Sequence, residues 1–127
     1  MKALVECIKG TKEKYESKNG ELVLDRMLKK KWNSNYGCIK ETLQADGDEL
    51  DTYVLGKVKR GEEVEVLPIC IFYCIDGLHI DNKLVCAAST AGRNIKWQVK
   101  RIKHFISHYK KGSFVVGMSY KDSNIRY

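Results

Sequence analysis

Short apolar runs dominate the first two-thirds of the chain. They are rich in Val, Ile, Leu and Tyr and are separated by turn residues, a pattern typical of strands. Asn19-Gly20 lies between two runs and predicts a hairpin, because a type I′ turn needs positive φ at both central residues. Asp76-Gly77 predicts a second turn after the longest run. Strands are predicted over residues 3–8, 14–17, 21–24, 36–39, 51–55, 64–75, 79–87 and 114–120.

One segment near the C-terminal end has the periodicity of a helix. Ile95, Val99, Ile102, Ile106 and Tyr109 recur at steps of three and four residues, which places them on one apolar stripe. Lysines occupy the last turn, where cations complement the helix dipole, and a glycine then ends the pattern. Many short strands with one helix predict a mainly β fold, a small closed barrel with an attached helix.

Length and composition suit one ordinary globular domain over residues 1–127. No apolar run approaches the ~20 residues of a membrane-spanning helix, and the N-terminus has no apolar stretch of a secretory signal. We therefore expect a cytoplasmic location without a membrane partner. The five cysteines are odd in number and irregularly spaced, which favours buried free thiols over disulfides or a zinc site.

The net charge of +7 is concentrated in the last quarter of the chain. Residues 96–127 contain eight Lys or Arg and one acidic residue, whereas residues 1–95 contain fifteen of each sign. This asymmetry predicts an anionic partner, either nucleic acid or a phosphate compound, and composition does not choose between them.

The most informative stretch is Asp46-Gly47-Asp48-Glu49-Leu50-Asp51. Asp46 and Asp48 would share one face of an extended chain, ~7 Å apart, whereas Asp51 has the opposite parity. All three converge only if the chain bends, which Gly47 permits. Carboxylates ~4 Å apart repel by ~1 to 4 kcal/mol per pair, so a convergent cluster predicts a multivalent cation. A solvated acidic turn is the alternative for this segment, and the spacing differs from that of an EF-hand.

Two further acids and a lysine follow the long apolar run, at Asp76, Asp81 and Lys83. Ordinary exposed charges around a hairpin turn are the alternative interpretation. Together with the earlier cluster, they favour a metal site.

This set of motifs resembles the soluble, magnesium-dependent inorganic pyrophosphatases of family I. The stretch from Asp46 to Asp51 is similar to the signature that builds the family's metal site. Other landmarks of the family are matched, in the same order, by Glu6, Lys14-Tyr15-Glu16, Asp25-Arg26, Asn35-Tyr36-Gly37, the spacing of Asp76, Asp81 and Lys83, His104-Phe105 and His108-Tyr109-Lys110.

The resemblance implies a five-stranded, OB-like barrel that hydrolyses pyrophosphate to two phosphates with several Mg²⁺ ions. Asp46, Asp51 and Asp81 would hold one ion, and Asp51 would reach a second. Asp76 and Asp81 would serve a third, and Glu16 would reach a fourth through water. Asp48 would accept the proton of the attacking water. The implied substrate-binding residues are Lys14, Arg26, Tyr36, Lys83, Tyr109 and Lys110, with Glu6 and Trp32 as supporting residues.

Several of these residues have alternatives outside the family frame. Lys14 and Lys83 could be solvated surface residues, and Arg26 could pair with Asp25. Tyr36 and Tyr109 could belong to the core. His104 and His108 could form a metal pair, although packing or capping is favoured because no motif supplies a third ligand.

The chain departs from the family in its loops, as a shortened member. The loop before Asn35 lacks the usual Tyr-Pro pair and has Trp32 near the usual tyrosine. We expect the indole to lie near the bound anion and to replace a hydroxyl that donates, because an indole N–H cannot accept. The usual C-terminal helix is absent, and a homo-oligomer stays open because such segments often build oligomer contacts.

Two other functions compete with this hypothesis. An OB-type nucleic-acid-binding module would explain the barrel and the basic C-terminal region. It is disfavoured because six acids would repel phosphates unless cations are bound. A catalytically weak relative would normally have lost a metal ligand, and none of the family's ligands is missing.

Overall fold

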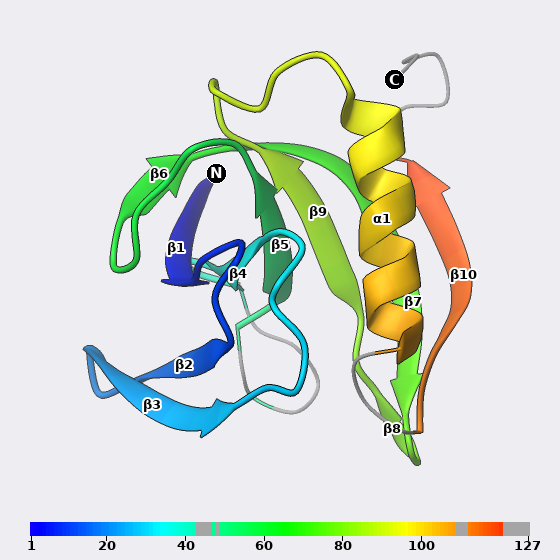
Figure 1. The fold of residues 1–127 in the computed structure, drawn as a ribbon, viewed down its shortest axis with the longest axis horizontal. Coiled ribbons are helices and arrows are strands. Elements are labelled where there is room, and N and C mark those ends of the chain that lie inside the picture. Colours follow the sequence, from blue (N-terminus) through cyan, green and yellow to red (C-terminus); the bar gives the residue numbers. More distant parts are fainter. Residues whose placement is uncertain (43–46, 48, 109–111, 121–127) are drawn as a thin grey trace.

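The computed structural model describes residues 1–42, 47, 49–108 and 112–120 of the chain. It is mainly β with one helix, as predicted (Figure 1). The elements are β1 (Lys2–Cys7), β2 (Glu13–Lys18), β3 (Glu21–Met27), β4 (Asn35–Ile39), β5 (Asp51–Leu55), β6 (Glu63–Glu65), β7 (Leu67–Asp76), β8 (His79–Ile80), β9 (Lys83–Ala87), α1 (Ile95–His108) and β10 (Ser113–Tyr120).

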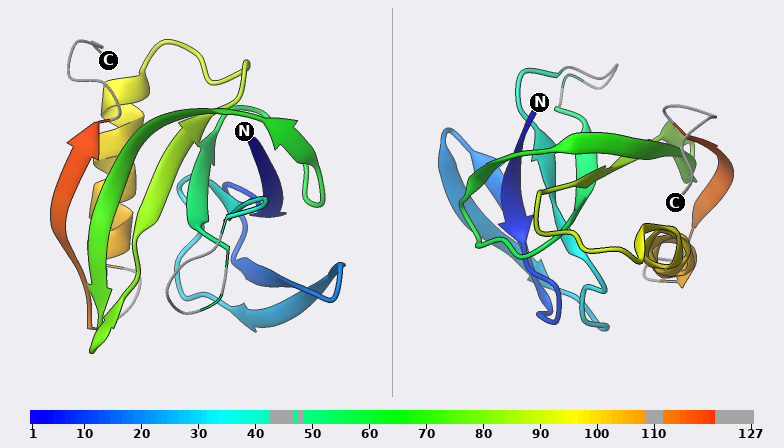
Figure 2. Two further views of the ribbon diagram at one scale, coloured as in Figure 1. Left: turned by 180° about the vertical axis from the view of Figure 1, so that it is seen from behind. Right: turned by 90° about the horizontal axis from the view of Figure 1, so that it is seen from above.

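One main sheet contains eight of the strands, and its path is strongly curled (Figure 2). Its order is β10-β7-β9-β5-β4-β1-β6, with β8 paired to β7. The pairs are antiparallel except β5 and β9, which run side by side in the same direction (Figure 1). Strands β2 and β3 form a separate hairpin that extends from the sheet next to β1. The curled sheet and its helix agree with the OB-like fold that the resemblance implies.

The turn signals of the sequence are confirmed. Asn19 and Gly20 have φ of 52° and 80°, the positive values that a type I′ hairpin needs. The second turn follows β7 at Gly77, whose φ is 62°. These turns set the register of the β2–β3 hairpin and of the short ribbon that β7 forms with β8.

Two predicted strands are each divided into two shorter strands. The run at 64–75 divides at Val66 into β6, which pairs with β1, and β7, which pairs with β9. The run at 79–87 divides at Asp81 and Asn82, which bond to the backbone of Cys74 before β9 begins. Apolar patterning cannot show such breaks, because each piece continues to alternate within its own pairing.

The larger core cluster lies between the curled sheet and α1, and a second cluster without helix residues lies among β1, β4, β5 and β9. Val99, Ile102 and Ile106 of the predicted stripe are buried, and Phe105 joins them. Tyr109 lies outside the described residues. All five cysteines are buried free thiols, which confirms that interpretation. No helix in the described part of the chain is long and apolar enough to cross a membrane.

Candidate active site

A cleft of about 790 Å³ lies between the β2–β3 hairpin and the first residues of β5 and β9. Charged and polar side chains from most strands of the sheet reach it. The described residues that line it are Glu6, Lys14, Tyr15, Glu16, Ser17, Lys18, Tyr36, Cys38, Gly47, Glu49, Asp51, Asp76, His79, Ile80, Asp81 and Lys83. Seven of the predicted site residues are therefore brought together, along with the supporting Glu6.

A buried ammonium group organises the inner end of the cleft. Lys83 is only 4% exposed, and its Nζ donates to Asp51 Oδ2 at 2.8 Å and to Tyr36 Oη at 2.7 Å. Its Nζ also lies 3.0 Å from Asp81 Oδ2. Asp51 and Lys83 are paired residues at the starts of the parallel strands β5 and β9, so strand register places them side by side.

Charge pairing explains how the ammonium group of Lys83 can be buried at the inner end of the cleft. An ammonium group removed from water needs carboxylate or hydrogen-bond partners, and Lys83 has two carboxylates and a phenol. The two carboxylates carry more negative charge than one ammonium neutralises. Their side chains remain 33% and 28% exposed toward the cleft, so their free oxygens can bind a further cation.

Glu6 connects the sheet to the hairpin. Its Oε2 accepts a 2.7 Å hydrogen bond from the backbone N–H of Ser17, which joins β1 to β2 beside Glu16. Burial raises the pKa of Glu6 from 4.5 to about 7, and the charges of Asp51 and Glu16 act in the same direction. Glu6 therefore titrates near neutral pH at the wall of the cleft.

The hairpin brings only part of its predicted set into the cleft. Lys14 and Glu16 line it, whereas Arg26, which pairs with Lys14 across the hairpin, is not among the lining residues. Arg26 is 3.8 Å from Asp25 Oδ2, and its side chain is 47% exposed. Arg26 therefore lies on the outer strand of the hairpin, beside Asp25.

Trp32 supports the site from behind the cleft. The indole is 2% exposed and stacks on the ring of Tyr36, with centroids 4.9 Å apart and planes at 18°. Its Nε1 donates to the carbonyl oxygen of Glu13 at 3.1 Å. The expectation that this N–H faces the anion was wrong, because the ring is buried among aromatic side chains and its donor satisfies the hairpin backbone.

Gly37 explains the close packing behind Tyr36. A Cβ at this position would overlap the carbonyl oxygen of Leu4 in the neighbouring strand. Only glycine lets β4 approach β1 this closely, and the approach places Tyr36 and Cys38 on the cleft.

Four predicted site residues, Asp46, Asp48, Tyr109 and Lys110, lie outside the described residues. Within the described ranges, no three His, Cys, Asp or Glu side chains are grouped closely enough to hold an ion on their own. Gly47, between the first two of these aspartates, does line the cleft and has a φ of 86°. The bend that the sequence allowed at this glycine is present.

Sequence reasoning assigned no role to Glu49, Cys38 or His79, which also line the cleft. Glu49 accepts from the backbone N–H of Glu41 at 2.8 Å and lies 3.8 Å from Cys38 Sγ. It therefore ties the acidic segment to the end of β4. The position of Glu49 within the acidic motif indicated that it lies near the other acids, but it did not indicate the hydrogen bond to Glu41.

The paired histidines of α1 lie apart from the cleft residues. His104 and His108 are exposed and their rings stack with centroids 4.1 Å apart. His108 Nδ1 is 2.7 Å from the carbonyl oxygen of His104, a contact that caps the last turn of the helix.

Comparison with known proteins identifies the family. Residues 3–121 match the family model described as inorganic pyrophosphatase. The inorganic pyrophosphatase of Nanoarchaeum equitans is 32% identical over 131 residues, covering 89% of this chain and 82% of that protein. The inorganic pyrophosphatase of Sulfolobus acidocaldarius is 35% identical over 125 residues, covering 85% of this chain and 72% of that protein.

Solved structures agree with the sequence matches. The crystal structure of an inorganic pyrophosphatase from Neisseria gonorrhoeae aligns with a TM-score of 0.83 and 25% identity. It covers 94% of this chain and 82% of that one. The Thermus thermophilus inorganic pyrophosphatase gives the same TM-score and identity. This chain therefore belongs to the inorganic pyrophosphatases, which are hydrolases acting on a phosphoric anhydride.

Proposed function

We propose that this chain hydrolyses inorganic pyrophosphate to two phosphates in the cleft around Lys83, with Mg²⁺ held by the surrounding carboxylates. The observation that carries the proposal is the convergence of Asp51 and Asp81 on one buried ammonium group. The strand register that builds this convergence leaves acidic oxygens facing a cleft wide enough for a small anion and its cations.

The carboxylates at the cleft fit Mg²⁺. Asp51, Asp76, Asp81 and Glu16 offer hard oxygen donors, which Mg²⁺ prefers, and all four line one cavity. Asp46 joins them in the proposal, because Gly47 next to it lines the same cavity. Bound Mg²⁺ would lower the pKa of a water molecule and neutralise phosphoryl oxygens.

The remaining residues of the proposed site bind the substrate and move one proton. The oxygen of the attacking water forms a bond to one phosphorus while the bridging P–O bond breaks. Asp48 accepts the proton that this water releases. Cationic and phenolic groups stabilise the charge that develops on the two phosphates. The proposed substrate-binding groups are Lys14, Arg26, Tyr36, Lys83, Tyr109 and Lys110.

The side chains of Tyr36 and Lys83 are already oriented for the proposed binding of substrate. Their mutual hydrogen bond holds the phenol oxygen and the ammonium at the inner end of the cleft. Trp32 and Tyr53 pack against the Tyr36 ring with centroids 4.9 Å away in each case. Such support reduces the reorganisation that substrate binding requires.

We also propose that residues 1–127 act as one domain, since the main sheet contains strands from both ends of the chain. The homo-oligomer that the family allows stays a prediction.

The test of the proposed function is phosphate release from pyrophosphate and from ATP, measured side by side with Mg²⁺ and with a chelator. We expect release from pyrophosphate that depends on Mg²⁺ and little release from ATP. Release that the chelator does not change would contradict the metal assignment. Preference for ATP would contradict the substrate.

A further inference from the structure

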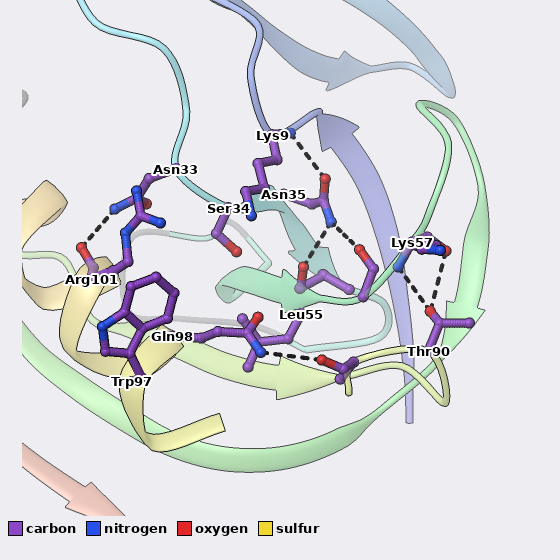
Figure 3. A pocket seen from close by; sticks show the side chains of 13 residues that line it. Lys9, Asn33, Ser34, Asn35, Leu55, Lys57, Thr90, Trp97, Gln98 and Arg101 are labelled. Carbon is purple, nitrogen blue, oxygen red and sulfur yellow. Dashed lines mark hydrogen bonds between the residues drawn. The ribbon is translucent and has the colours of Figure 1, made fainter. Parts of the chain in front are cut away.

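A second cavity lies at the other end of β4 and β5 from the cleft (Figure 3). It has a volume of about 190 Å³ and shares no lining residue with the cleft. Its walls come from the segment after β1, the residues before and at the start of β4, the end of β5, the loop after β9 and the first turns of α1. We call it the basic pocket, and its charged and polar lining residues are Lys9, Asn33, Ser34, Asn35, Lys57, Thr90, Gln98 and Arg101.

The charges of the basic pocket are all positive. Lys9, Lys57 and Arg101 line it, and no acidic residue does. In the described part of the chain, none of these three cations lies within 4.0 Å of a carboxylate oxygen. Exposed lysines are common, but three cations around one concave space without a counter-charge create a positive potential that favours an anion.

Most polar side chains of the basic pocket are satisfied by the protein backbone. Asn35 bonds to the backbone of Lys9, Val54 and Gly56. Thr90 Oγ1 accepts from the N–H of Lys57. These bonds fix the walls of the pocket and leave its shape well defined.

Two side chains of the basic pocket keep an unpartnered polar atom in the part of the chain that the structure describes. Asn33 Oδ1 is buried without a hydrogen-bond partner, and the hydroxyl of Ser34, a residue that is 4% exposed, makes no hydrogen bond to the protein. Figure 3 shows this hydroxyl directed into the space between the lining side chains. A hydroxyl that makes no bond to the protein and faces a cationic pocket is available to donate to an oxygen of an anion.

An indole forms one edge of the basic pocket. Trp97 is 58% exposed, and the Arg101 guanidinium lies 4.9 Å from the centre of its ring. The stack holds the guanidinium at the rim, where its N–H groups can bind an oxyanion bidentately.

We propose that the basic pocket binds a phosphate group, either as orthophosphate or on a nucleotide. A phosphate group has several acceptor oxygens, so it can accept from the Ser34 hydroxyl and from a cation of the lining together, while the remaining cations add to the positive potential. This site goes beyond the hydrolytic cleft, and its walls are joined to the cleft where Asn35 precedes Tyr36.

The chain contains two tryptophans, of which Trp97 lines the basic pocket and Trp32 is buried behind the cleft, so the two can be detected separately. The wild-type protein labelled with fluorotryptophan should give one fluorine resonance for Trp97 and one for Trp32, assigned with a Trp97→Phe variant. Inorganic phosphate, AMP and adenosine are each titrated in the presence of a chelator. We expect phosphate and AMP to shift the Trp97 resonance to saturation, and adenosine to leave it nearly unchanged.

Variants at the cations test the assignment. Lys9→Ala with Lys57→Ala should raise the Kd for phosphate roughly tenfold or more, the effect expected from losing charge-assisted hydrogen bonds. Lys103→Ala is the control, because Lys103 is an exposed lysine of α1 that does not line the pocket. Its Kd should equal that of the wild type.

The outcomes separate the two sources and the two cavities. Tighter binding of AMP than of phosphate assigns the site to nucleotides, and equal binding assigns it to orthophosphate. The proposal is overturned if the Trp97 resonance does not move at roughly 10 mM of either probe. It is also overturned if the Lys9 and Lys57 variant binds as tightly as the control, or if adenosine shifts Trp97 as strongly as AMP. None of these results depends on hydrolytic activity.

Discussion

The cleft and the basic pocket lie at opposite ends of β5 and differ in the balance of their charges. Asp51 begins the strand at the cleft and Leu55 ends it at the pocket, four residues or ~13 Å away at the usual strand rise. In the cleft, a buried ammonium is outnumbered by carboxylates. In the pocket, exposed cations have no carboxylate within 4.0 Å in the described chain.

The difference shows what burial does to charge. Lys83 is 4% exposed and requires its partners, so it is part of the structure as much as of the site. Lys57 is exposed and solvated, so it costs the fold little and remains available to a ligand. Equivalent substitutions at the two lysines should therefore have unequal effects on stability.

The largest effect is expected for Lys83→Met. Removing the ammonium leaves Asp51 and Asp81 facing each other without a counter-charge, which should destabilise the metal-free protein by about 3 to 5 kcal/mol. Urea denaturation in a chelator measures the loss. Lys57→Met is the matched control and should stay within about 0.5 kcal/mol of the wild type. Equal losses in the two variants would contradict the contrast between buried and solvated charge.

Asp51→Asn should have the next largest effect, on turnover. The amide keeps the shape of the side chain but loses the charge that we propose binds Mg²⁺, so we expect pyrophosphate hydrolysis to fall on the order of 10²- to 10³-fold. Phosphate release at saturating Mg²⁺ measures it. Glu63→Gln, at an exposed position of β6, is the control and should retain full activity. Near-wild-type turnover of Asp51→Asn would remove Asp51 from the metal site.

Glu6 should make the stability of the metal-free protein depend on pH. Its pKa is raised from 4.5 to about 7 in the folded chain, so the folded state binds more protons than the unfolded state between these values. The contribution of Glu6 to the free energy of unfolding therefore falls as pH rises through this window, by up to about 3 kcal/mol.

Urea denaturation of the metal-free protein at about pH 5 and about pH 8 tests this dependence. Glu6→Gln can still accept from the N–H of Ser17 and does not titrate, so its stability should decline less between the two conditions. Identical slopes for variant and wild type would show that Glu6 keeps an ordinary pKa.

Local patterning predicted most of the fold because strands and helix each have their own periodicity. The α1 stripe at Val99, Ile102 and Ile106 and the Asn19-Gly20 turn needed no knowledge of the rest of the chain. The break at Val66 could not be predicted, because it arises where the run changes from pairing with β1 to pairing with β9. The break before β9 arises where Asp81 and Asn82 bond to the backbone of Cys74 in the neighbouring strand, a contact that local patterning does not show.

The candidate site, like the fold, could be predicted only in part from the sequence. The resemblance to the family's spacing pointed to Asp81 and Lys83 as site residues, and both line the cleft. The bonds from Lys83 to Asp51 and Tyr36 depend on strands that meet only in three dimensions. The position of Trp32 in its loop led us to predict that the indole lies at the cleft. In the structure it packs instead against the rings of Tyr36 and Phe105 in the core.

The smallest effect is expected in the emission of Trp32. A Trp97→Phe variant leaves Trp32 as the only tryptophan, buried between the rings of Tyr36 and Phe105. Its N–H is bonded to the Glu13 carbonyl, so a ligand in the cleft reaches the indole only through the Tyr36 ring and the hairpin. Mg²⁺ added with a non-hydrolysable pyrophosphate analogue should therefore change the emission slightly, because Tyr36 donates or accepts at the inner end of the cleft. An unchanged spectrum at saturation, with binding confirmed by calorimetry, would show that the stacked rings do not respond to cleft occupancy. The same titration in wild-type protein adds only the emission of Trp97, which faces the basic pocket and should not respond to a ligand confined to the cleft.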